Sequence, residues 1–434
     1  MSYFPYGLMY ALAVFVLLPF EYFKRPAYLR KRWLREKFGF ITPPERGRTK
    51  DAGGKTIWVH AVSVGEVIAA IPLLKRLRET YPSGNIVLST ITDTGQEVAG
   101  ERMPEGVSVI YLPFDIHAVL DRAVRRIKPE LLIIMETELW PNLFRTCHMN
   151  NVSVILLNGR ISEKSFKGYS RISFFMKKVL SFVDFFGMQN EEYAERIRSL
   201  GVDGGRVMNI GNFKFDAVPP SRIPVWAERL KKPVLIAGST HDGEEELITS
   251  VYTELKRDFP GLNLLIAPRH PERFNEVETI LKAKKVSYIR RSALGSRCGE
   301  KMLDGAKESV TPQIEGYVLL LDSVGELSSV YGISDIAIIG KSFRGQGGQN
   351  PLEPASWGKP IVCGPHMENF PVIKEFYRAG AALEVPEEEL FSTLKELLSN
   401  PEKAAAVGGK AQELYRNNSG AVERALEIIK RYVE

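Results

Sequence analysis

Glu66 is a carboxylate in the turn His60-Ala-Val-Ser-Val-Gly-Glu66, where acid–base chemistry could take place. The apolar run 56–59 before this turn predicts a buried strand, and residues 67–74 after it continue with helical spacing. Open α/β sheets bind ligands at turns that follow the carboxyl ends of parallel strands, and the next helix N-terminus favours negative charge there. Glu66 is therefore a candidate for chemistry at a strand-to-helix turn.

The same spacing also fits a purely structural role for Glu66. Ser63 and Glu66 match a capping box, with Ser63 as the N-cap and Glu66 returning a hydrogen bond from position N3. Spacing alone favours the cap over catalysis, so both interpretations stay open at this point.

Arg269 is a candidate phosphate ligand in the second half of the chain. It follows a predicted strand that ends at Ala267-Pro268, where its planar guanidinium could offer two donors to phosphate oxygens. An exposed arginine paired with Glu272 fits the residues equally well.

The glycine-rich stretch 340–350 is more specific, because it follows a predicted strand and opens a predicted helix. Asn350 suits an N-cap, Pro351 suits the first helical position, and Glu353 sits at N3. Glu353 either caps the helix or holds a ribose diol, as carboxylates do in nucleotide sites. The sequence contains no P-loop, no GxGxxG and no cluster of metal ligands, so we expect catalysis without a metal or other cofactor.

Composition and charge narrow the class of protein. The 434 residues exceed the size of one ordinary domain, and 44% hydrophobic with 25% charged residues is typical of globular proteins. The net charge of +6 favours anionic partners without choosing among phosphorylated ligands, lipid headgroups and nucleic acid. Cys147, Cys298 and Cys363 lie far apart, which indicates a reducing compartment and no structural zinc site.

The N-terminus predicts a membrane anchor over residues 1–22. Residues 3–20 carry no charge and would form a helix about 27 Å long, close to the hydrocarbon thickness of a bilayer. No cleaved signal peptide is indicated, because the basic residues follow the apolar run. The basic segment 23–50 places the body of the protein in the cytoplasm by the positive-inside rule. An interfacial or core helix is the alternative, because the run is short for a span.

Apolar strands alternate with helical patterns from residue 56 onward, which predicts parallel sheets covered on both faces. We expect a first Rossmann-like domain at 51–215, a proline-rich linker at 216–232 and a second Rossmann-like domain at 233–415. The polar stretch 292–316 is expected to be a surface insertion. A final helix at 416–434 carries one apolar stripe and is expected to pack back on the first domain.

The two predicted domains also look like a repeat. A shift of 178 positions places Leu77, Tyr81, Pro82 and Asn85 on Leu255, Phe259, Pro260 and Asn263, and Glu66 on Glu244. Two tandem Rossmann-like domains would produce this register, although any two βαβ units share a similar helix length.

Six ordered motifs carry a resemblance to a known family. The motifs cover 60–66, 135–142, 211–216, 239–245, 268–274 and 347–355. Together they resemble the bacterial transferases of 3-deoxy-D-manno-octulosonic acid (Kdo). The resemblance implies the GT-B fold, with two Rossmann-like domains facing a cleft that holds the active site. It further implies transfer of Kdo from CMP-Kdo to a lipid A precursor at the inner membrane, without a metal.

The resemblance also assigns roles to residues. Glu66 would be the general base that takes a proton from the acceptor hydroxyl, with Glu136 and Lys214 assisting the transition state. CMP would be held by Pro268, Arg269, Val324, Gly325, Glu326, Asn350, Pro351, Leu352 and Glu353.

Two positions depart from the family pattern: Gln349 stands where the family commonly has histidine, and Val324 where it has methionine. Gln349 keeps a donor and an acceptor but cannot titrate, which puts any proton transfer at this position in doubt. Val324 is expected to act through its backbone.

Two other functions stay in view: a GT-B enzyme with a different nucleotide sugar, and a noncatalytic membrane protein that binds anionic lipid through residues 24–37. No nucleic-acid partner is expected, and the sequence does not predict an oligomeric state.

Overall fold

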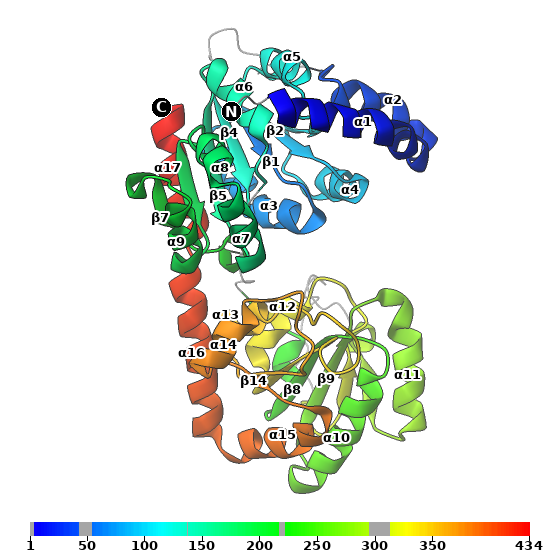
Figure 1. Ribbon diagram of the computed structural model, residues 1–434. Helices are drawn as coiled ribbons and strands as arrows, with labels where there is room; N and C mark the ends of the chain where they lie inside the picture. The colour runs from blue at the N-terminus through cyan, green and yellow to red at the C-terminus, as the bar shows by residue number, and fades with distance from the viewer. Residues whose placement is uncertain (1–3, 43–53, 137, 217–221, 295–312) are drawn as a thin grey trace, which may run out of the picture. The chain divides into compact units, whose positions relative to one another are not determined.

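The computed structural model describes residues 4–42, 54–136, 138–216, 222–294 and 313–434 (Figure 1). The chain divides into two compact units, each described below by itself. Unit 1 comprises Met1–Ala217 with Asn418–Glu434, and unit 2 comprises Val218–Asn417.

Unit 1 is a seven-stranded parallel sheet in the order β3-β2-β1-β4-β5-β6-β7. Its strands are β1 (Thr56–His60), β2 (Asn85–Thr90), β3 (Val107–Tyr111), β4 (Leu131–Met135), β5 (Ser153–Gly159), β6 (Phe185–Met188) and β7 (Val207–Asn209). Its helices are α1 (Phe4–Lys24), α2 (Ala27–Lys37), α3 (Val64–Thr80), α4 (Asp93–Arg102), α5 (His117–Ile127), α6 (Pro141–Met149), α7 (Glu163–Arg171), α8 (Ser173–Leu180), α9 (Glu191–Ser199) and α17 (Ala421–Val433). The direction of sheet growth reverses between β1 and β4, which makes this the switch point where such sheets bind ligands.

The sheet of unit 1 is buried on both faces because its strands are continuous aliphatic runs. Alternate side chains of one strand enter different cores: Leu132 and Ile134 lie in one cluster, and Ile133 and Met135 in the other. The second cluster also contains the inner face of α17, so the C-terminal helix completes the core of unit 1.

Unit 2 holds a second seven-stranded parallel sheet in the order β10-β11-β9-β8-β12-β13-β14. Its strands are β8 (Val234–Thr240), β9 (Asn263–Pro268), β10 (Tyr288–Arg290), β11 (Val318–Leu320), β12 (Ile336–Ile339), β13 (Ile361–Cys363) and β14 (Leu383–Glu384). Its helices are α10 (Glu244–Asp258), α11 (Phe274–Ala283), α12 (Leu327–Val330), α13 (Leu352–Ser356), α14 (Ile373–Ala379), α15 (Leu390–Ser399) and α16 (Pro401–Asn418). The switch point here lies between β8 and β12.

The repeat predicted from the 178-residue shift is confirmed in the strand register. Thr56 pairs with Asn85 in unit 1, and Val234 pairs with Asn263 in unit 2. Even a connecting hydrogen bond repeats: the Asn85 N–H donates to the carbonyl of Lys55 at 2.9 Å, and the Asn263 N–H donates to that of Pro233 at 2.9 Å. The aromatic-Pro-x-x-Asn pattern therefore marks the same helix-to-strand connection in both units.

The region predicted as a linker, 216–232, is partly built into unit 2. Trp226, Ala227 and Leu230 lie in a core cluster of that unit, because three large or apolar side chains between the prolines still gain by burial. Most of the predicted insertion 292–316 lies outside the described residues.

Asp216 fastens the returning chain to unit 1. Its carboxylate accepts hydrogen bonds from the backbone N–H groups of Gly420 and Val422, at the N-terminus of α17. Ser419 adds a hydrogen bond to the carbonyl of Phe215 at 3.2 Å. A carboxylate is well suited to this position because it satisfies N–H groups that have no partner within the helix and complements the helix dipole.

We predict that Asp216→Ala loosens α17. Loss of the cap should lower the free energy of opening of this helix by about 1 to 2 kcal/mol, the range for N-cap removal. Hydrogen exchange of α17 amides, followed by mass spectrometry, measures this directly. Asp203→Ala is the matched control, because Asp203 caps only a three-residue helix, and it should leave α17 unchanged. Equal α17 protection in the Asp216→Ala and wild-type proteins would contradict the prediction.

Candidate active site

Glu66 and Glu136 follow the two strands that flank the switch point of unit 1, β1 and β4. Glu66 is only 8% exposed. Its carboxylate accepts a hydrogen bond from the Val62 N–H at 2.8 Å and from the Ser63 hydroxyl at 3.2 Å. Its own N–H donates to Ser63 Oγ at 3.4 Å, so Ser63 is the N-cap of α3. The cap is thus present, but the carboxylate bonds to Val62 rather than to the Ser63 N–H that the capping box predicts.

The cap does not offset the effect of burial on the pKa of Glu66. Burial raises the pKa of Glu66, the Val62 hydrogen bond lowers it, and the negative charges of Glu136 and Glu138 raise it again, to about 7. A carboxyl group with a pKa near neutrality is suited to accept a proton and release it again. The two interpretations of Glu66 are therefore compatible, because the cap geometry holds in place a carboxyl group whose pKa lies near neutrality.

Glu136 lies in a strained turn beside two positive charges. Its φ of +55° is in the left-handed region, where residues other than glycine are uncommon. Burial raises the pKa of Glu136, and the charges of Lys214 and Arg160 lower it, leaving the pKa above its ordinary value. Lys214 lies on a short helix, Phe213–Asp216, anchored by a hydrogen bond from the Phe213 N–H to Asn158 Oδ1 at 3.1 Å.

The three residues predicted for catalysis therefore gather at one edge of unit 1, joined by Glu138 and Arg160, which the sequence reasoning missed. Glu138 is part of the motif 135–142, and burial together with Glu136 raises its pKa. Arg160 follows β5 directly. Glu138 and Arg160 both come after a buried strand, and this position in the sequence could have identified them.

In unit 2, Arg269 follows β9 and its charge acts on Glu353. Burial raises the pKa of Glu353, while the hydrogen bond from Asn350 and the charge of Arg269 lower it; the net pKa is above its ordinary value. Within the described part of the chain, Glu272 pairs with His270 at 3.7 Å and no ion pair joins it to Arg269. The alternative partner considered for Arg269 is therefore not the one the structure shows.

The turn before α13 departs by one residue from the predicted cap. The helix begins at Leu352, so Pro351 occupies the N-cap position instead of the first helical one. Asn350 Oδ1 still accepts the Leu352 N–H at 3.1 Å, and its Nδ2 donates to Glu353 Oε1 at 3.2 Å. Asn350 and Glu353 thus form one hydrogen-bonded pair.

The turn 324–326 can contact a ligand through its backbone groups, because the Glu326 carboxylate is already hydrogen-bonded. Val324 is 78% exposed, and Gly325 has a φ of +91° that favours glycine. Glu326 accepts hydrogen bonds from Trp226 Nε1 at 2.9 Å and from Arg291 Nη2 at 3.1 Å. Pro268, the remaining predicted CMP residue, is the buried end of β9.

Comparison with known proteins identifies the family. Residues 32–217 match the family model described as 3-deoxy-D-manno-octulosonic-acid transferase (kdotransferase). The chain is 34% identical over 424 residues to the 3-deoxy-D-manno-octulosonic acid transferase of Haemophilus influenzae, covering 95% of this chain and 93% of the relative. It belongs to the Kdo transferase family. A further relative of the same name, from Bordetella pertussis, is 32% identical, with 86% of each chain covered.

The fold of this glycosyltransferase is of the GT-B class. The crystal structure of MurG from Acinetobacter baumannii has a TM-score of 0.53 at 12% identity, covering 87% of this chain and 99% of that chain. That likeness concerns the fold alone. It agrees with two units that each contain a seven-stranded parallel sheet.

In unit 2 of this Kdo transferase, the 178-residue shift matches Glu244 to Glu66 of unit 1. It is completely buried at the start of α10. Its carboxylate accepts the N–H groups of Lys341 at 2.7 Å, Ser342 at 3.0 Å and Phe343 at 3.0 Å, and that of His241 at 3.0 Å. Glu244 therefore fixes the start of the loop 340–350 against the turn after β8, across the switch point of unit 2.

We predict that Glu244→Gln releases the loop after β12. The amide keeps one acceptor but places N–H groups against backbone donors, so at least one charge-assisted hydrogen bond is lost, worth about 1.5 to 3 kcal/mol. Hydrogen exchange at 341–344 should speed up accordingly. Glu246→Gln, an exposed neighbour on the same turn of α10, is the matched control. An unchanged rate of hydrogen exchange at 341–344 in Glu244→Gln would show that the loop keeps its conformation without the Glu244 carboxylate.

Proposed function

We propose that this Kdo transferase moves Kdo from CMP-Kdo to a lipid A precursor, lipid IVA, with inversion at the anomeric carbon and without a metal. The observation that carries the proposal is Glu66: a buried carboxyl group with a pKa of about 7, held by its helix cap at the switch point of unit 1. Membership of the Kdo transferase family indicates which sugar is transferred, and the mechanism is inferred from the residues of the site.

In the proposed step, the acceptor hydroxyl oxygen bonds to the anomeric carbon of Kdo as its proton passes to the Glu66 carboxylate. The bond between that carbon and the CMP phosphate breaks, and its electron pair leaves with the phosphate. One displacement from the opposite face inverts the centre. Glu136 and Lys214 assist by holding opposite charges beside the reacting groups.

Unit 2 is proposed to hold CMP. Arg269 would neutralise the phosphate, and its position near Glu353 places it beside the turn that opens α13. The hydrogen-bonded pair Asn350 and Glu353 would bind the ribose, with Pro351 and Leu352 shaping the turn. Pro268 and the backbone of Val324-Gly325-Glu326 complete the proposed site.

The proposed place of action is the inner membrane, with both units on the cytoplasmic side. In support, the helix Pro5–Lys24 has the length and apolar composition of a membrane helix, and the basic residues that follow it favour the anionic cytoplasmic leaflet. Incubation with lipid IVA and CMP-Kdo, followed by mass analysis of the lipid, tests donor, acceptor and the number of sugars added. A panel of other nucleotide sugars tests the alternative donor. No addition of Kdo under these conditions would overturn the proposal.

Glu66→Gln should lower transfer roughly 100- to 10,000-fold, the usual contribution of a positioned base. In the wild type, kcat/KM should rise with pH around 7, because the base acts only when ionised. Glu79→Gln, which removes an exposed carboxylate from the same helix, should transfer normally.

Stability separates this role from a mere cap. The folded pKa of Glu66 lies above its unfolded value, so the wild type loses stability as pH rises toward and through about 7. Glu66→Gln removes that loss and should be at least as stable as wild type at pH 8. If Glu66→Gln were less stable than the wild type but turned over normally, the role of Glu66 would be that of a helix cap, which contributes about 1 kcal/mol.

Arg269→Lys should weaken CMP binding by roughly 1.5 to 3 kcal/mol, because a point charge cannot replace a bidentate guanidinium. Gln349→His should change affinity far less, because the amide already supplies a hydrogen-bonding group. Calorimetric titration of CMP into the three proteins measures both effects. Equal affinity for wild type and Arg269→Lys would remove Arg269 from the site.

A further inference from the structure

Helix α1 has two faces of different exposure. Tyr10, Val14, Leu18 and Tyr22, spaced by four residues, pack against the aromatic cluster Trp33, Tyr111 and Phe114 of unit 1. The other face is exposed and apolar, through Leu8, Met9, Leu12, Phe15, Val16, Leu17, Phe20 and Phe23. A row of large apolar side chains of this length on a soluble surface marks an interaction site.

Both ends of α1 are fastened to unit 1. Near its start, the Tyr6 hydroxyl donates to Asp115 Oδ2 at 2.8 Å, and the Tyr6 ring lies 6.1 Å from that of Phe175. Just past its end, Arg25 Nε donates to Asp93 Oδ1 at 3.1 Å, and the guanidinium lies 4.1 Å from the ring centre of Trp33. Figure 1 shows α1 lying beside α2 on the same unit.

These contacts conflict with a helix that crosses the bilayer. The 21 residues of α1 span about 30 Å, the thickness of the hydrocarbon core. If α1 crossed, one of its two fastened ends would carry Asp93 or Asp115, with the polar loop around it, to the far side of the membrane. Irregular backbone and charged groups are not tolerated facing lipid.

We propose that α1 lies in the plane of the membrane and inserts its exposed face into one leaflet of an anionic phospholipid bilayer. Side chains on a helix of this kind reach about 5–10 Å into the headgroup and acyl boundary. The described residues of α1 then cross no membrane, and both ends of this helix stay on the side of unit 1. The sequence predicts a spanning anchor instead, and the depth measurement below distinguishes the two placements.

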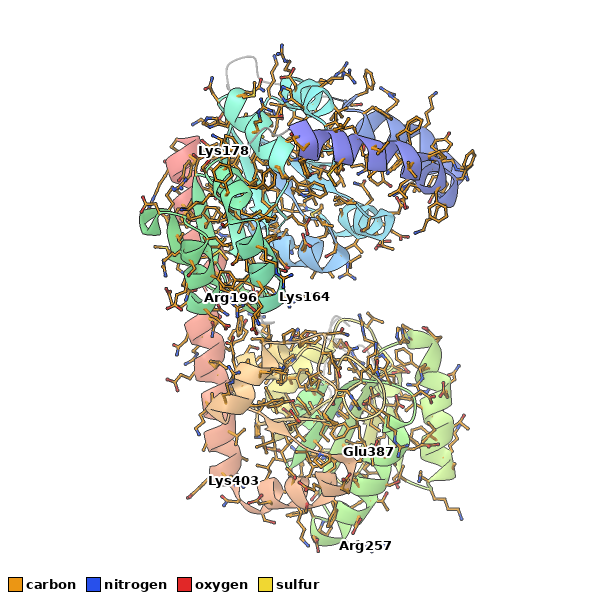
Figure 2. The ribbon with its side chains drawn as sticks, viewed as in Figure 1. Lys164, Lys178, Arg196, Arg257, Glu387 and Lys403 are labelled. Atoms are coloured by element: carbon orange, nitrogen blue, oxygen red, sulfur yellow. The ribbon has the colours of Figure 1, made fainter. Side chains whose placement is uncertain are left out.

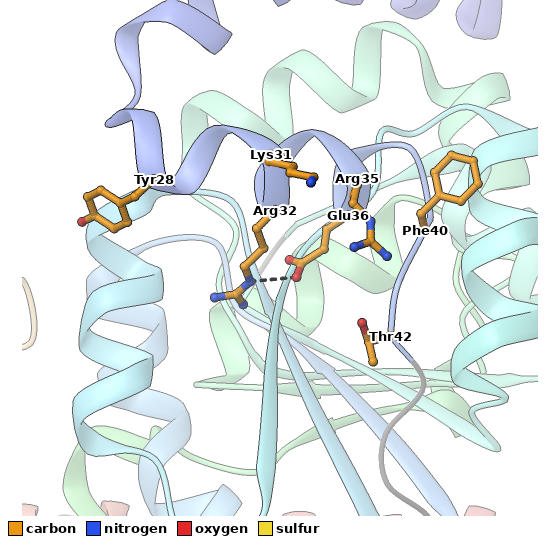
Figure 3. Close-up of a pocket in the computed structure, with 7 residues that line it drawn as sticks. All are labelled: Tyr28, Lys31, Arg32, Arg35, Glu36, Phe40 and Thr42. Carbon is orange, nitrogen blue, oxygen red and sulfur yellow. Dashed lines mark hydrogen bonds and ion pairs between the residues drawn. The ribbon is translucent and has the colours of Figure 1, made fainter.

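Charge on neighbouring elements fits an anionic leaflet. A pocket of about 460 Å³ on α2 is lined by Lys31, Arg32 and Arg35, with the rings of Tyr28 and Phe40 beside them (Figure 3). Among the described residues that line the pocket, Glu36 is the one acid, and it forms a 2.8 Å ion pair with Arg32. The pocket therefore keeps a net positive charge, suited to a lipid phosphate.

Helices α7 and α8 extend the same surface. Ile172 and Phe174 are 52% and 70% exposed and adjoin Phe175, the ring partner of Tyr6 on α1. Lys178, also on α8, carries positive charge near these side chains (Figure 2). Exposed apolar side chains beside a lysine are typical of a surface that rests in a membrane interface.

The proposal also has a consequence for the substrate. Asp93 and Asp115 follow β2 and β3, so α1 runs along the carboxyl edge of the sheet, the edge that carries Glu66 and Glu136. A leaflet held by α1 would bring a lipid acceptor to the side of unit 1 where the base lies. This last step rests on the proposed function; the placement of α1 does not.

Depth measurement on the full-length protein decides between the two placements. Nitroxides are attached one at a time to Leu8→Cys, Phe15→Cys and Phe23→Cys in a Cys298→Ser background, which retains the buried Cys147 and Cys363. The proteins are bound to phosphatidylethanolamine–phosphatidylglycerol vesicles without any acceptor lipid. Relative accessibility to oxygen and to a nickel chelate then gives each depth.

We expect all three labels at one shallow depth, about 5–10 Å below the phosphates. A spanning helix would instead put Phe15 deepest, about 15 Å down, with the other two near opposite surfaces. That profile would overturn the proposal, and so would three labels as exposed to water as one at Glu79→Cys, an exposed position at the end of α3. Leu18→Cys, on the packed face, should be shielded from both reagents, and circular dichroism checks that each variant is folded.

The outcome is independent of catalysis. Three equal shallow depths together with no Kdo transfer would overturn the proposed function and leave the placement of α1 intact. A spanning profile in an active enzyme would do the reverse.

Discussion

The structure depends on how a buried carboxylate is compensated at the turn after the first strand of each sheet. Glu66 and Glu244 occupy equivalent positions in the two units, and both are buried. Glu244 is surrounded by backbone N–H groups from two loops, so its charge is fully used in holding the fold. The Glu66 carboxylate accepts hydrogen bonds from one backbone N–H and one hydroxyl. These bonds do not offset the effect of burial, so the pKa of Glu66 is raised. The positions matched by the 178-residue shift therefore carry a carboxylate saturated with backbone hydrogen bonds in unit 2 and a carboxyl group with a raised pKa in unit 1.

This difference explains why the helix cap and the chemistry at Glu66 are not competing interpretations. A cap restricts the rotamer of the carboxyl group, which is what a base needs in order to meet a substrate proton at a defined distance. Incomplete hydrogen bonding leaves the carboxyl group basic. The neighbouring carboxylates Glu136 and Glu138 push its pKa further up, and Lys214 limits their effect by acting on Glu136.

Much of the fold was predictable because long aliphatic runs and the aromatic-Pro-x-x-Asn repeat are local signals. The strands that escaped prediction, such as β7 and β14, are only three and two residues long and are made by pairing with neighbours rather than by pattern. Within the candidate site, the turn of Glu66 was visible from spacing, whereas Glu136 and Lys214 were proposed only through the family resemblance, and their roles stay predictions. Spacing alone could not show how far burial would shift the pKa of Glu66, since that depends on side chains distant in sequence. The sequence could not show that α1 packs one face on unit 1 and exposes the other. An uncharged run has the same pattern whether lipid contacts one face of the helix or surrounds it.

The return of the chain to unit 1 sets an order of events during synthesis. The core of unit 1 is incomplete until Val422, Ala425, Leu426 and Ile429 of α17 are in place, and these follow unit 2 in the chain. The 200 residues of Val218–Asn417 are translated before them, which at roughly 5–20 residues per second takes about 10 to 40 s. Unit 2 has all its strands before unit 1 is complete, although the strands of unit 1 precede it. During that interval the part of the sheet face that α17 covers is exposed while α3 covers the rest, and a ribosome that stops before residue 418 leaves it so.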